Sequence, residues 1–362
     1  MKEYLNQQDM KDSNLNNVFH LLLHEKQMTR RQIEAVTHLS WGAVSNVTSL
    51  LMRLGYIREV KAENPGNGRT PSYLEINGEN YFTIGVDINT SGFKATLLNL
   101  NNETIYTASC PSVCTDQDAL ISRVTDLIHE VLDYADGCHI LCIGVAMQGL
   151  VDAVNGISVQ FAPCREWKNV PLAQILEDSL GIPVFLEHDP NCVLYAYSAP
   201  RQISEAILVR IDDGIGMAVM MDGRIFPRPG AFELGHTLVT PGTSDNLRLQ
   251  AYASRIGLGT LTGMPFEKLA EAAAAKDPSA AAHFARMAEY LAFTISNAAQ
   301  LLNISEIVIC GDMLLHQDLF WNQMLQNAHI FQPQLHFSTT EVDMAAVGAA
   351  MIALERYTLT SE

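Results

Sequence analysis

A strip of small and polar side chains between residues 42 and 53 has the chemistry needed to read DNA bases. Its members recur at three- and four-residue spacing, so they would share one face of a helix: Gly42, Ser45, Asn46, Ser49 and Arg53. Asn46 carries an amide that can pair with the edge of an adenine in the major groove. Apolar residues occupy the opposite face. This pattern predicts a helix that enters the major groove of DNA.

Basic residues are concentrated around this strip. Between residues 26 and 69 only Glu34, Glu59 and Glu63 oppose a larger set of cations, which is Lys26, Arg30, Arg31, Arg53, Arg58, Lys61 and Arg69. Such an excess on a short stretch suits contacts with phosphate groups. The whole chain of 362 residues has a net charge of −17, yet residues 1–75 hold nine Lys and Arg against eight Asp and Glu. The acidic remainder should repel DNA, so we expect DNA to contact this part alone.

The seven cysteines suggest a second kind of chemistry, because two pairs are spaced by four residues. Cys110 with Cys114, and Cys138 with Cys142, could be read as metal ligands, but no nearby second pair completes either set. Buried, reduced thiols are the favoured interpretation. The sequence also has no apolar run of membrane-spanning length and no apolar leader at its polar start, so we expect a cytoplasmic protein with no membrane contact.

Three short helices must position the DNA-reading strip. The first ends near Lys26 and is predicted from apolar residues at helical spacing (15, 18, 19, 22 and 23). Thr29 has the hydroxyl of a cap for the second helix, and Ser40 has that of a cap for the third. Gly55 is suited to end the third helix after Leu54.

Two predicted strands, 56–60 and 73–76, enclose a Gly- and Pro-rich segment that presents Arg69 to a minor groove or a phosphate. The sequence thus predicts a winged helix-turn-helix domain over residues 14–77. Its DNA-binding candidates are Thr29, Arg30, Ser40, Trp41, Gly42, Ser45, Asn46, Ser49, Arg53 and Arg69. The alternative is an interaction module that never touches DNA.

The rest of the chain alternates strands and helices and predicts an α/β body of two lobes. One lobe is expected over 80–188 with 345–362, and the other over 189–344. Predicted strands are 82–87, 93–100, 103–109, 139–146, 183–187, 206–211, 217–221 and 306–310. Predicted helices are 120–132, 167–180, 267–275, 279–303 and 345–356.

The body resembles the ROK family (repressors, open reading frames and kinases), whose members have the two-lobed, actin-like fold of sugar kinases. The resemblance rests on the order and spacing of Gly85-Val-Asp-Ile88, Gly144-Val-Ala-Met-Gln-Gly-Leu-Val-Asp152, Gly181-Ile-Pro-Val-Phe-Leu-Glu-His-Asp-Pro-Asn191, Gly230-Ala-Phe-Glu-Leu-Gly-His236 and Gly348-Ala-Ala350. The predicted winged helix-turn-helix domain over residues 14–77, called the head from here on, includes Gly68-Arg-Thr-Pro71 and resembles the DNA-binding end of the repressor branch.

The resemblance implies a sugar site. Asp189 falls where the family places the carboxylate that accepts the proton of a sugar hydroxyl, which makes it the catalytic residue if the chain is a kinase. Glu233 and His236 fall where the family contacts sugar hydroxyls. His188 and Gln250 replace an asparagine and a glutamate of the family pattern, so we expect altered sugar selectivity.

Departures from the pattern imply a degenerate nucleotide site. Asp87 is kept, but Asn89 stands where a glycine would approach phosphate. The second phosphate loop carries Asp213 before Gly214 and Gly216, and Gly311 is followed by an aspartate. After His236, residues 237–250 contain none of the cysteines of the family's zinc site. We therefore expect no metal and no cofactor, and we doubt that ATP binds.

Together these features predict a sugar-responsive transcription regulator, most plausibly a repressor. A small carbohydrate or sugar phosphate is expected to bind between the lobes and to alter binding of a double-stranded DNA operator by a homodimer or a dimer of dimers. The first alternative is an ATP-dependent sugar kinase that carries a DNA-binding head. The second is a body that responds to a partner protein in place of a sugar.

Overall fold

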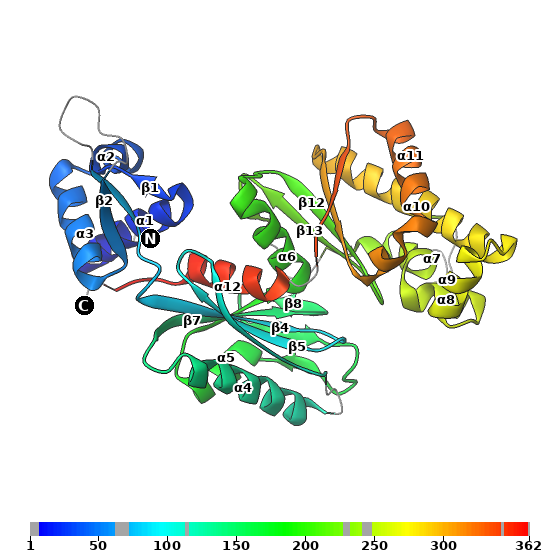
Figure 1. Cartoon of the computed structure of the whole chain (residues 1–362), viewed down its shortest axis with the longest axis horizontal. Coiled ribbons are helices and arrows are strands. Elements are labelled where there is room, and N and C mark those ends of the chain that lie inside the picture. Colours follow the sequence, from blue (N-terminus) through cyan, green and yellow to red (C-terminus); the bar gives the residue numbers. More distant parts are fainter. Residues whose placement is uncertain are drawn as a thin grey trace, which may run out of the picture. The chain divides into compact units, whose positions relative to one another are not determined.

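Two compact units make up the chain (Figure 1). The computed structural model describes residues 7–61, 72–112, 116–226, 232–240, 248–341 and 344–360. The first unit contains residues 1–145, 171–186 and 349–362, and the second contains 146–170 and 187–348. This division differs from the predicted lobes, which placed 146–170 in the first. The reason is that β8 (Leu150–Asp152), β9 (Ile157–Gln160) and β10 (Lys168–Val170) pair only with one another, in a small sheet of their own.

The three helices of the head form as predicted, and local capping fixes the ends of the second and third. The Thr29 hydroxyl accepts a hydrogen bond from the backbone amide of Gln32, and the side-chain oxygen of Gln32 accepts one from the backbone amide of Thr29, which is a complete capping box. Ser40 accepts from the amide of Ala43, and the last helix ends at Gly55 with φ of 83°. The helices are α1 (Gln7–Glu25), α2 (Arg30–Thr37) and α3 (Trp41–Leu54).

A three-stranded sheet completes the head, in the order β1-β3-β2. The strands are β1 (Gln27–Met28), β2 (Ile57–Lys61) and β3 (Ser72–Ile76), and of these β1 was not predicted. The hairpin of β2 and β3 confirms the predicted frame of the wing. The tip of the wing, including Arg69, lies outside the described residues.

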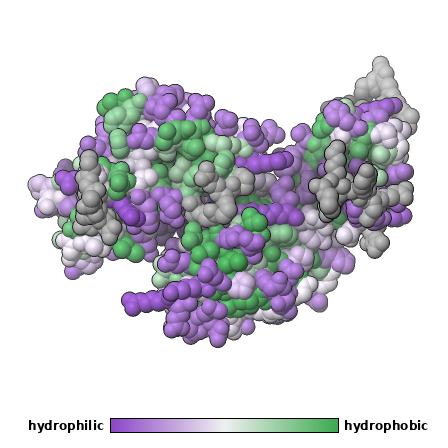
Figure 2. Space-filling view, turned by 180° about the vertical axis from the view of Figure 1, so that it is seen from behind, coloured by the Kyte–Doolittle hydropathy of each residue, from purple (hydrophilic) through white to green (hydrophobic). Residues whose placement is uncertain are grey.

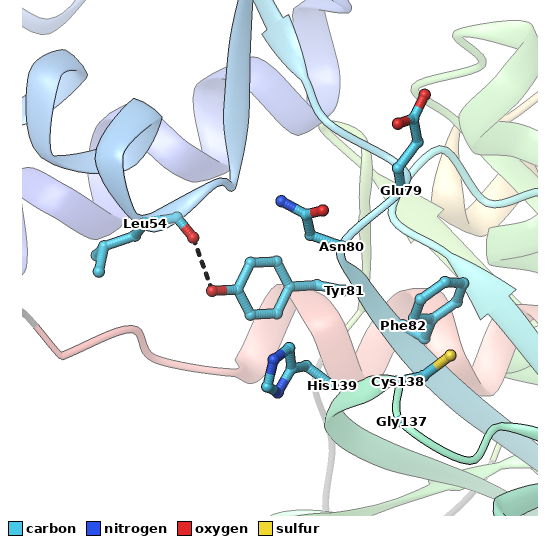
Figure 3. Close-up of a pocket in the computed structure, with 8 residues that line it drawn as sticks. All are labelled: Leu54, Glu79, Asn80, Tyr81, Phe82, Gly137, Cys138 and His139. Atoms are coloured by element: carbon cyan, nitrogen blue, oxygen red, sulfur yellow. Dashed lines mark hydrogen bonds between the residues drawn. The ribbon is translucent and has the colours of Figure 1, made fainter.

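The head and the first lobe share one hydrophobic core. Leu141, Ala353 and Leu359 of the lobe belong to the same buried cluster as the helices of the head. Tyr81 stacks on Tyr56 with ring centroids 4.1 Å apart, and its hydroxyl donates to the carbonyl of Leu54 at 2.8 Å. A pocket of about 430 Å³ lies at this junction (Figure 3) and is lined by Leu54, Glu79, Asn80, Tyr81, Phe82, Gly137, Cys138 and His139.

The first unit is built on a five-stranded sheet in the order β11-β7-β4-β5-β6. The strands are β4 (Tyr81–Ile88), β5 (Phe93–Asn99), β6 (Thr104–Cys110), β7 (His139–Met147) and β11 (Val184–His188). The helices α4 (Gln117–Tyr134) and α5 (Leu172–Leu180) lie beside the sheet, as does α12 (Ala345–Arg356), red in Figure 1. Only part of the predicted helix 167–180 forms. Lys168–Val170 is a strand, and Pro171 separates it from α5.

The second unit repeats this design with a sheet in the order β14-β13-β12-β15-β16. Both sheets place the first of their strands at the centre, the next two on one side and the last two on the other. The strands are β12 (Ala206–Ile211), β13 (Ile215–Met221), β14 (Arg224–Ile225), β15 (Glu306–Cys310) and β16 (His336–Thr339). The two repeated sheets confirm the predicted two-lobed α/β fold.

Helices cover the second sheet and bury a large apolar core against it. They are α6 (Asp189–Ser198), η1 (Ala199–Arg201), η2 (Leu234–His236), α7 (Leu249–Ala253), α8 (Arg255–Thr262), α9 (Phe266–Ala274), α10 (Pro278–Leu302), η4 (Asp312–Leu319) and α11 (Trp321–Phe331). None of the helices in the described part of the chain is long and apolar enough to cross a membrane. Hydrophilic side chains dominate the face of the molecule in Figure 2.

Candidate functional site

The predicted DNA-reading strip lies on the outer face of α3. Gly42, Asn46, Ser49 and Arg53 are exposed there, and Ser45 is half-buried. The opposite face is buried in the core of the head through Val44, Val47, Thr48 and Leu51. The strip is therefore available to a ligand, and because its side chains are not needed to hold the helix in place, it can vary in chemistry without loss of the fold.

Two basic residues before the strip have different surroundings. Arg30 turns inward, where its Nε donates to the Thr48 hydroxyl at 3.2 Å and its Nη2 lies 3.5 Å from Glu59. This guanidinium ties α2 to α3 and β2. Arg31 instead lies over the ring of Trp41, 4.4 Å from its centroid, and forms an exposed cationic and aromatic pair that the sequence pattern did not reveal. The roles of Thr29 and Ser40 as caps also occupy their hydroxyls.

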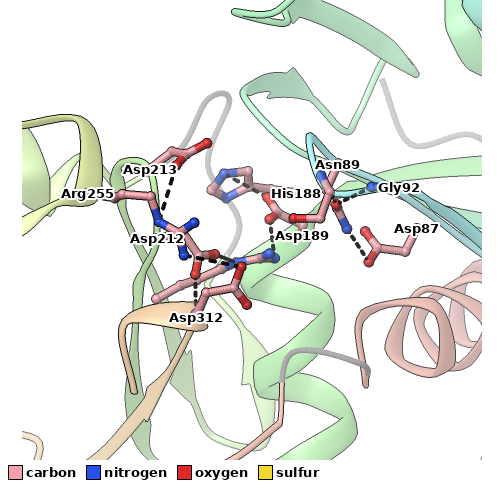
Figure 4. A network of polar contacts seen from close by, with 11 residues as sticks. Asp87, Asn89, Gly92, His188, Asp189, Asp212, Asp213, Arg255 and Asp312 are labelled. Carbon is pink, nitrogen blue, oxygen red and sulfur yellow. Dashed lines mark hydrogen bonds and ion pairs between the residues drawn. The ribbon is translucent and has the colours of Figure 1, made fainter. Parts of the chain in front are cut away.

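In the second unit, Asp189 begins α6 and is almost fully buried, with 3 % of its surface exposed. Its Oδ2 accepts a hydrogen bond of 2.5 Å from Nη1 of Arg210, which is itself 8 % exposed (Figure 4). The Nε of Arg210 donates to Oδ2 of Asp212 at 2.5 Å. One guanidinium thus joins two carboxylates in the interior.

Strand alternation explains why Arg210 points toward Asp189. Ile207, Val209 and Ile211 of β12 face the main core, so the residues between them face the other side, where α6 packs. Arg210 was not among the predicted site residues. Its only signal in the sequence is a lone charge within the apolar strand 206–211, and a single sequence does not reveal which carboxylate such a charge would meet.

His188 lies beside this ion pair and is 7 % exposed. Its Nε2 is 3.5 Å from Oδ1 of Asp189. Its Nδ1 is buried and has no hydrogen-bond partner among the described residues. A buried ring nitrogen without a partner costs about 1–3 kcal/mol.

Glu233 and His236 lie together at η2, as predicted, with 3.6 Å between Oε2 of Glu233 and Nε2 of His236. Both side chains are about half-exposed. Nη1 of Arg248 is 2.7 Å from Nδ1 of His236 and so fixes the ring. Arg248 was missed because the segment before it has no periodicity. The preceding stretch 227–231 and the loop 241–247 lie outside the described residues.

Close backbone packing brings η2 near the start of α6. A Cβ on Gly235 would lie 3.0 Å from the carbonyl oxygen of Ile215 and 3.3 Å from Cβ of Gln250. A Cβ on Gly216 would lie 3.0 Å from the ring of Pro190, the residue that follows Asp189. The beginning of β13 therefore lies between the two groups of sugar-binding candidates, and Gln250 adjoins the second group.

Polar contacts join the loop between β12 and β13 to η4 and α8. The carboxylate of Asp212 accepts the backbone amide of Asp312 at 2.5 Å. The guanidinium of Arg255 lies 3.8 Å from both Asp213 and Asp312. Burial, with Asp212 nearby, raises the pKa of Asp312 above its usual range. Three carboxylates and the guanidinium groups of Arg210 and Arg255 thus gather at the predicted second phosphate loop.

The remaining candidate residues of the nucleotide site are divided between the two units. In the first unit, Nδ2 of Asn89 donates to Asp87 at 2.8 Å. In the second, Gly311 has φ of 115°, and a Cβ there would lie 2.2 Å from the carbonyl oxygen of Ile211. Gly311 also lines a cavity of about 540 Å³ with Asp312, Leu314, Leu315, Gln317, Thr339, Thr340 and Glu341.

Within the described residues, no group of three or more His, Cys, Asp or Glu side chains is placed so that it could hold a metal ion. Cys142 is buried, and burial raises the pKa of its thiol to about 12. Cys138 is exposed and lies near the head, while Cys114 lies outside the described residues.

Comparison with known proteins places these features in context. A family model described as the ROK family matches residues 83–356. The xylose repressor of Caldicellulosiruptor bescii is 26 % identical over 230 residues, which cover 61 % of this chain and 57 % of that protein. The chain therefore spans little more than half the length of that relative. The DNA-binding transcriptional dual regulator NagC of Escherichia coli is 26 % identical over 326 residues, 82 % of this chain and 79 % of NagC.

Solved structures show the same fold. A ROK family transcriptional regulator, a homologue of the E. coli MLC protein, superposes with a TM-score of 0.79 at 20 % identity and covers 96 % of this chain and 97 % of that one. A ROK hexokinase of Thermus thermophilus covers 76 % of this chain and 98 % of its own, with a TM-score of 0.66 at 19 % identity. The fold is thus common to regulators and kinases, and it does not by itself exclude catalysis.

Proposed function

Because the chain belongs to the ROK family, we propose that it is a transcription regulator that responds to a carbohydrate. The observation that carries the sugar half of this proposal is the buried Nδ1 of His188, which has no partner among the described residues and lies beside Asp189. Sugar hydroxyls can donate to an imidazole nitrogen and to a carboxylate. The names of two curated relatives, the xylose repressor and an N-acetylglucosamine repressor of Escherichia coli, support a monosaccharide as the ligand class.

The DNA half of the proposal rests on the exposed face of α3. Asn46, Ser49 and Arg53 project from a helix that caps and core contacts fix in place, and the surrounding segment carries excess positive charge. These are the features of a recognition helix. We propose that two copies of the chain bind the two halves of an operator as a homodimer.

A sugar kinase is the second candidate, because Asp189 begins α6 in a buried position suited to contact a sugar hydroxyl. Against it stand Asp212, Asp213 and Asp312, whose charge does not suit the phosphates of ATP. We propose that the chain is not a kinase. Release of ADP that depends on sugar and disappears in Asp189→Asn would reverse this proposal.

Thermal unfolding of the full chain against aldoses, amino sugars and their phosphates is the first test. The effector should stabilise the protein by about 2–3 kcal/mol at a hundredfold excess over its Kd. His188→Ala should abolish this shift, whereas His283→Ala on α10 of the same unit should keep it. DNA enriched by the protein from a random pool should then be released or bound more tightly on addition of the same sugar. The proposal fails if no sugar stabilises the chain and no DNA sequence is enriched.

A further inference from the structure

Arg210 forms ion pairs with both Asp189 and Asp212, and this bridge between two carboxylates indicates a role for Arg210 in the site. We propose that Arg210 is a positioning residue that fixes Asp189 as a permanent hydrogen-bond acceptor for the sugar, so that the site holds its ligand without a nucleotide or a divalent cation. The inference rests on the proposed function, since it describes how the same site would bind its carbohydrate.

The geometry of the bridge is that of a structural ion pair. Nη1 of Arg210 is 2.5 Å from Oδ2 of Asp189, and both residues are more than nine-tenths buried. A buried charge pair is maintained only when further hydrogen bonds satisfy the remaining groups. Asp212 supplies one of these, because it accepts from Nε of the same guanidinium at 2.5 Å.

This arrangement leaves one side of the Asp189 carboxylate for a ligand. Oδ2 is taken by the guanidinium, whereas Oδ1 faces Nε2 of His188 at 3.5 Å. The guanidinium stays charged at every pH at which proteins fold, so the acceptor always has a cation beside it. Sugar hydroxyls are good donors to such an oxygen.

The same bridge removes the need for an external cation. Asp212 accepts from Arg210 through Oδ2 and from the amide of Asp312 through Oδ1, so both of its oxygens are engaged within the chain. The positive charge that a magnesium ion would bring to two neighbouring carboxylates is already supplied by a side chain. Sugar binding at Asp189 is then independent of ATP and Mg²⁺.

The ion pair can be tested without knowledge of the sugar. The full chain is unfolded with urea at about pH 5.5 and about pH 8 as wild type, Arg210→Met, Arg210→Lys, and Arg210→Met combined with Asp189→Asn or with Asp212→Asn. Without its cation, buried Asp189 should take up a proton on acidification, so Arg210→Met should lose more stability at the higher pH.

Asp189→Asn should remove most of the pH dependence of Arg210→Met, and Asp212→Asn should remove less because Asp212 is more exposed. The neighbouring ionisable groups are His188 on β11, Asp213 in the β12–β13 loop, Cys310 on β15 and Asp312 on η4, and they are unchanged in every variant. Arg210→Lys should restore part of the lost stability. The inference is overturned if Arg210→Met has the pH profile of the wild type or if Asp189→Asn leaves its profile unaltered.

Ligand binding tests the second part of the inference, with xylose, glucose and N-acetylglucosamine as probes. The wild type should bind a probe equally well with and without ATP and Mg²⁺, and Arg210→Met should bind it about tenfold or more weakly. A requirement for ATP and Mg²⁺ would overturn the inference. If none of the three sugars binds the wild type, the proposed function fails for them, whereas the unfolding profiles still decide whether Arg210 fixes Asp189.

Discussion

Asn16 and Leu359 exchange two hydrogen bonds although 343 residues separate them in the chain. The side-chain amide of Asn16 donates to the carbonyl of Leu359 at 2.9 Å, and its oxygen accepts from the amide of Leu359 at 2.7 Å. Leu359 is 2 % exposed in the core shared by the head and the first lobe. The segment after α12 thus connects the head to the first lobe.

Loss of this connection should weaken the head. Asn16→Ala leaves two backbone groups of Leu359 without partners and should reduce the free energy of unfolding by about 1–3 kcal/mol. Urea unfolding measures the loss, and DNA affinity should fall with it. Asn17→Ala, on the exposed side of the same helix, is the matched control and should be nearly neutral. Equal stability of the two variants would mean that the connection contributes nothing.

Substitutions on the predicted DNA-reading strip of α3 should change DNA affinity and not stability, because these side chains contact solvent and not the core. Asn46→Ala should cost about 1–3 kcal/mol of binding to a selected DNA site, and Arg53→Ala should lower the slope of log affinity against log salt by about 1. Fluorescence anisotropy at several salt concentrations measures both. Unfolding of these variants should match the wild type. Unchanged DNA affinity in both would place the groove contact elsewhere.

Acid should weaken the junction of head and lobe through His20. Burial lowers the pKa of His20 below its ordinary value of about 6.5, although Glu355 at 3.9 Å partly opposes the shift. The folded state therefore favours the neutral ring. The stability that depends on this neutral ring is present above the ordinary pKa and is lost as pH falls through that value toward the lowered one.

Thermal unfolding between about pH 7.5 and pH 5.5 should show this loss in the wild type. His20→Gln should have a flatter profile, whereas His24→Gln, which removes a more exposed imidazole from the same Glu355, should keep most of the slope. A profile for His20→Gln as steep as that of the wild type would assign the acid sensitivity to other groups.

The contact between β7 and α12 should tolerate no added side chain. A Cβ on Gly144 would lie 1.9 Å from the carbonyl oxygen of Ala349, which belongs to the backbone and cannot turn away. Gly144→Ala should therefore lower the free energy of unfolding by about 1–3 kcal/mol. Gly42→Ala is the control, because open space surrounds that position. A fully stable Gly144→Ala protein would show that α12 can shift.

Local signals made much of the fold predictable from the sequence. The caps Thr29 and Ser40 and the stop at Gly55 depend on residues within three positions, and each lies where it was predicted. The apolar segment 206–211 was likewise predicted as a strand and forms β12. The order of the strands in the two sheets involves distant partners and was not predicted, and the actin-like fold itself came only from the resemblance to a family.

The contacts within the candidate site were harder to predict from the sequence, because they join residues that are far apart in the chain. Asp189, Glu233 and His236 were named from the resemblance, and their roles remain predictions. Arg210 meets a carboxylate 21 positions away, and Arg248 meets His236 across a loop that has no periodicity. Neither partner is specified by spacing. The separation of 146–170 from the first lobe was missed because it depends on pairing among three very short strands.

The strand order that both units share has a consequence for how charge is distributed in the body. Asp87 lies one residue before the end of β4, and Arg210 lies one residue before the end of β12. Each strand is the centre of its sheet and continues into an antiparallel hairpin. Matching backbone positions therefore hold an acid in one copy and a base in the other. At this position the two sheets share the same strand order but carry side chains of opposite charge.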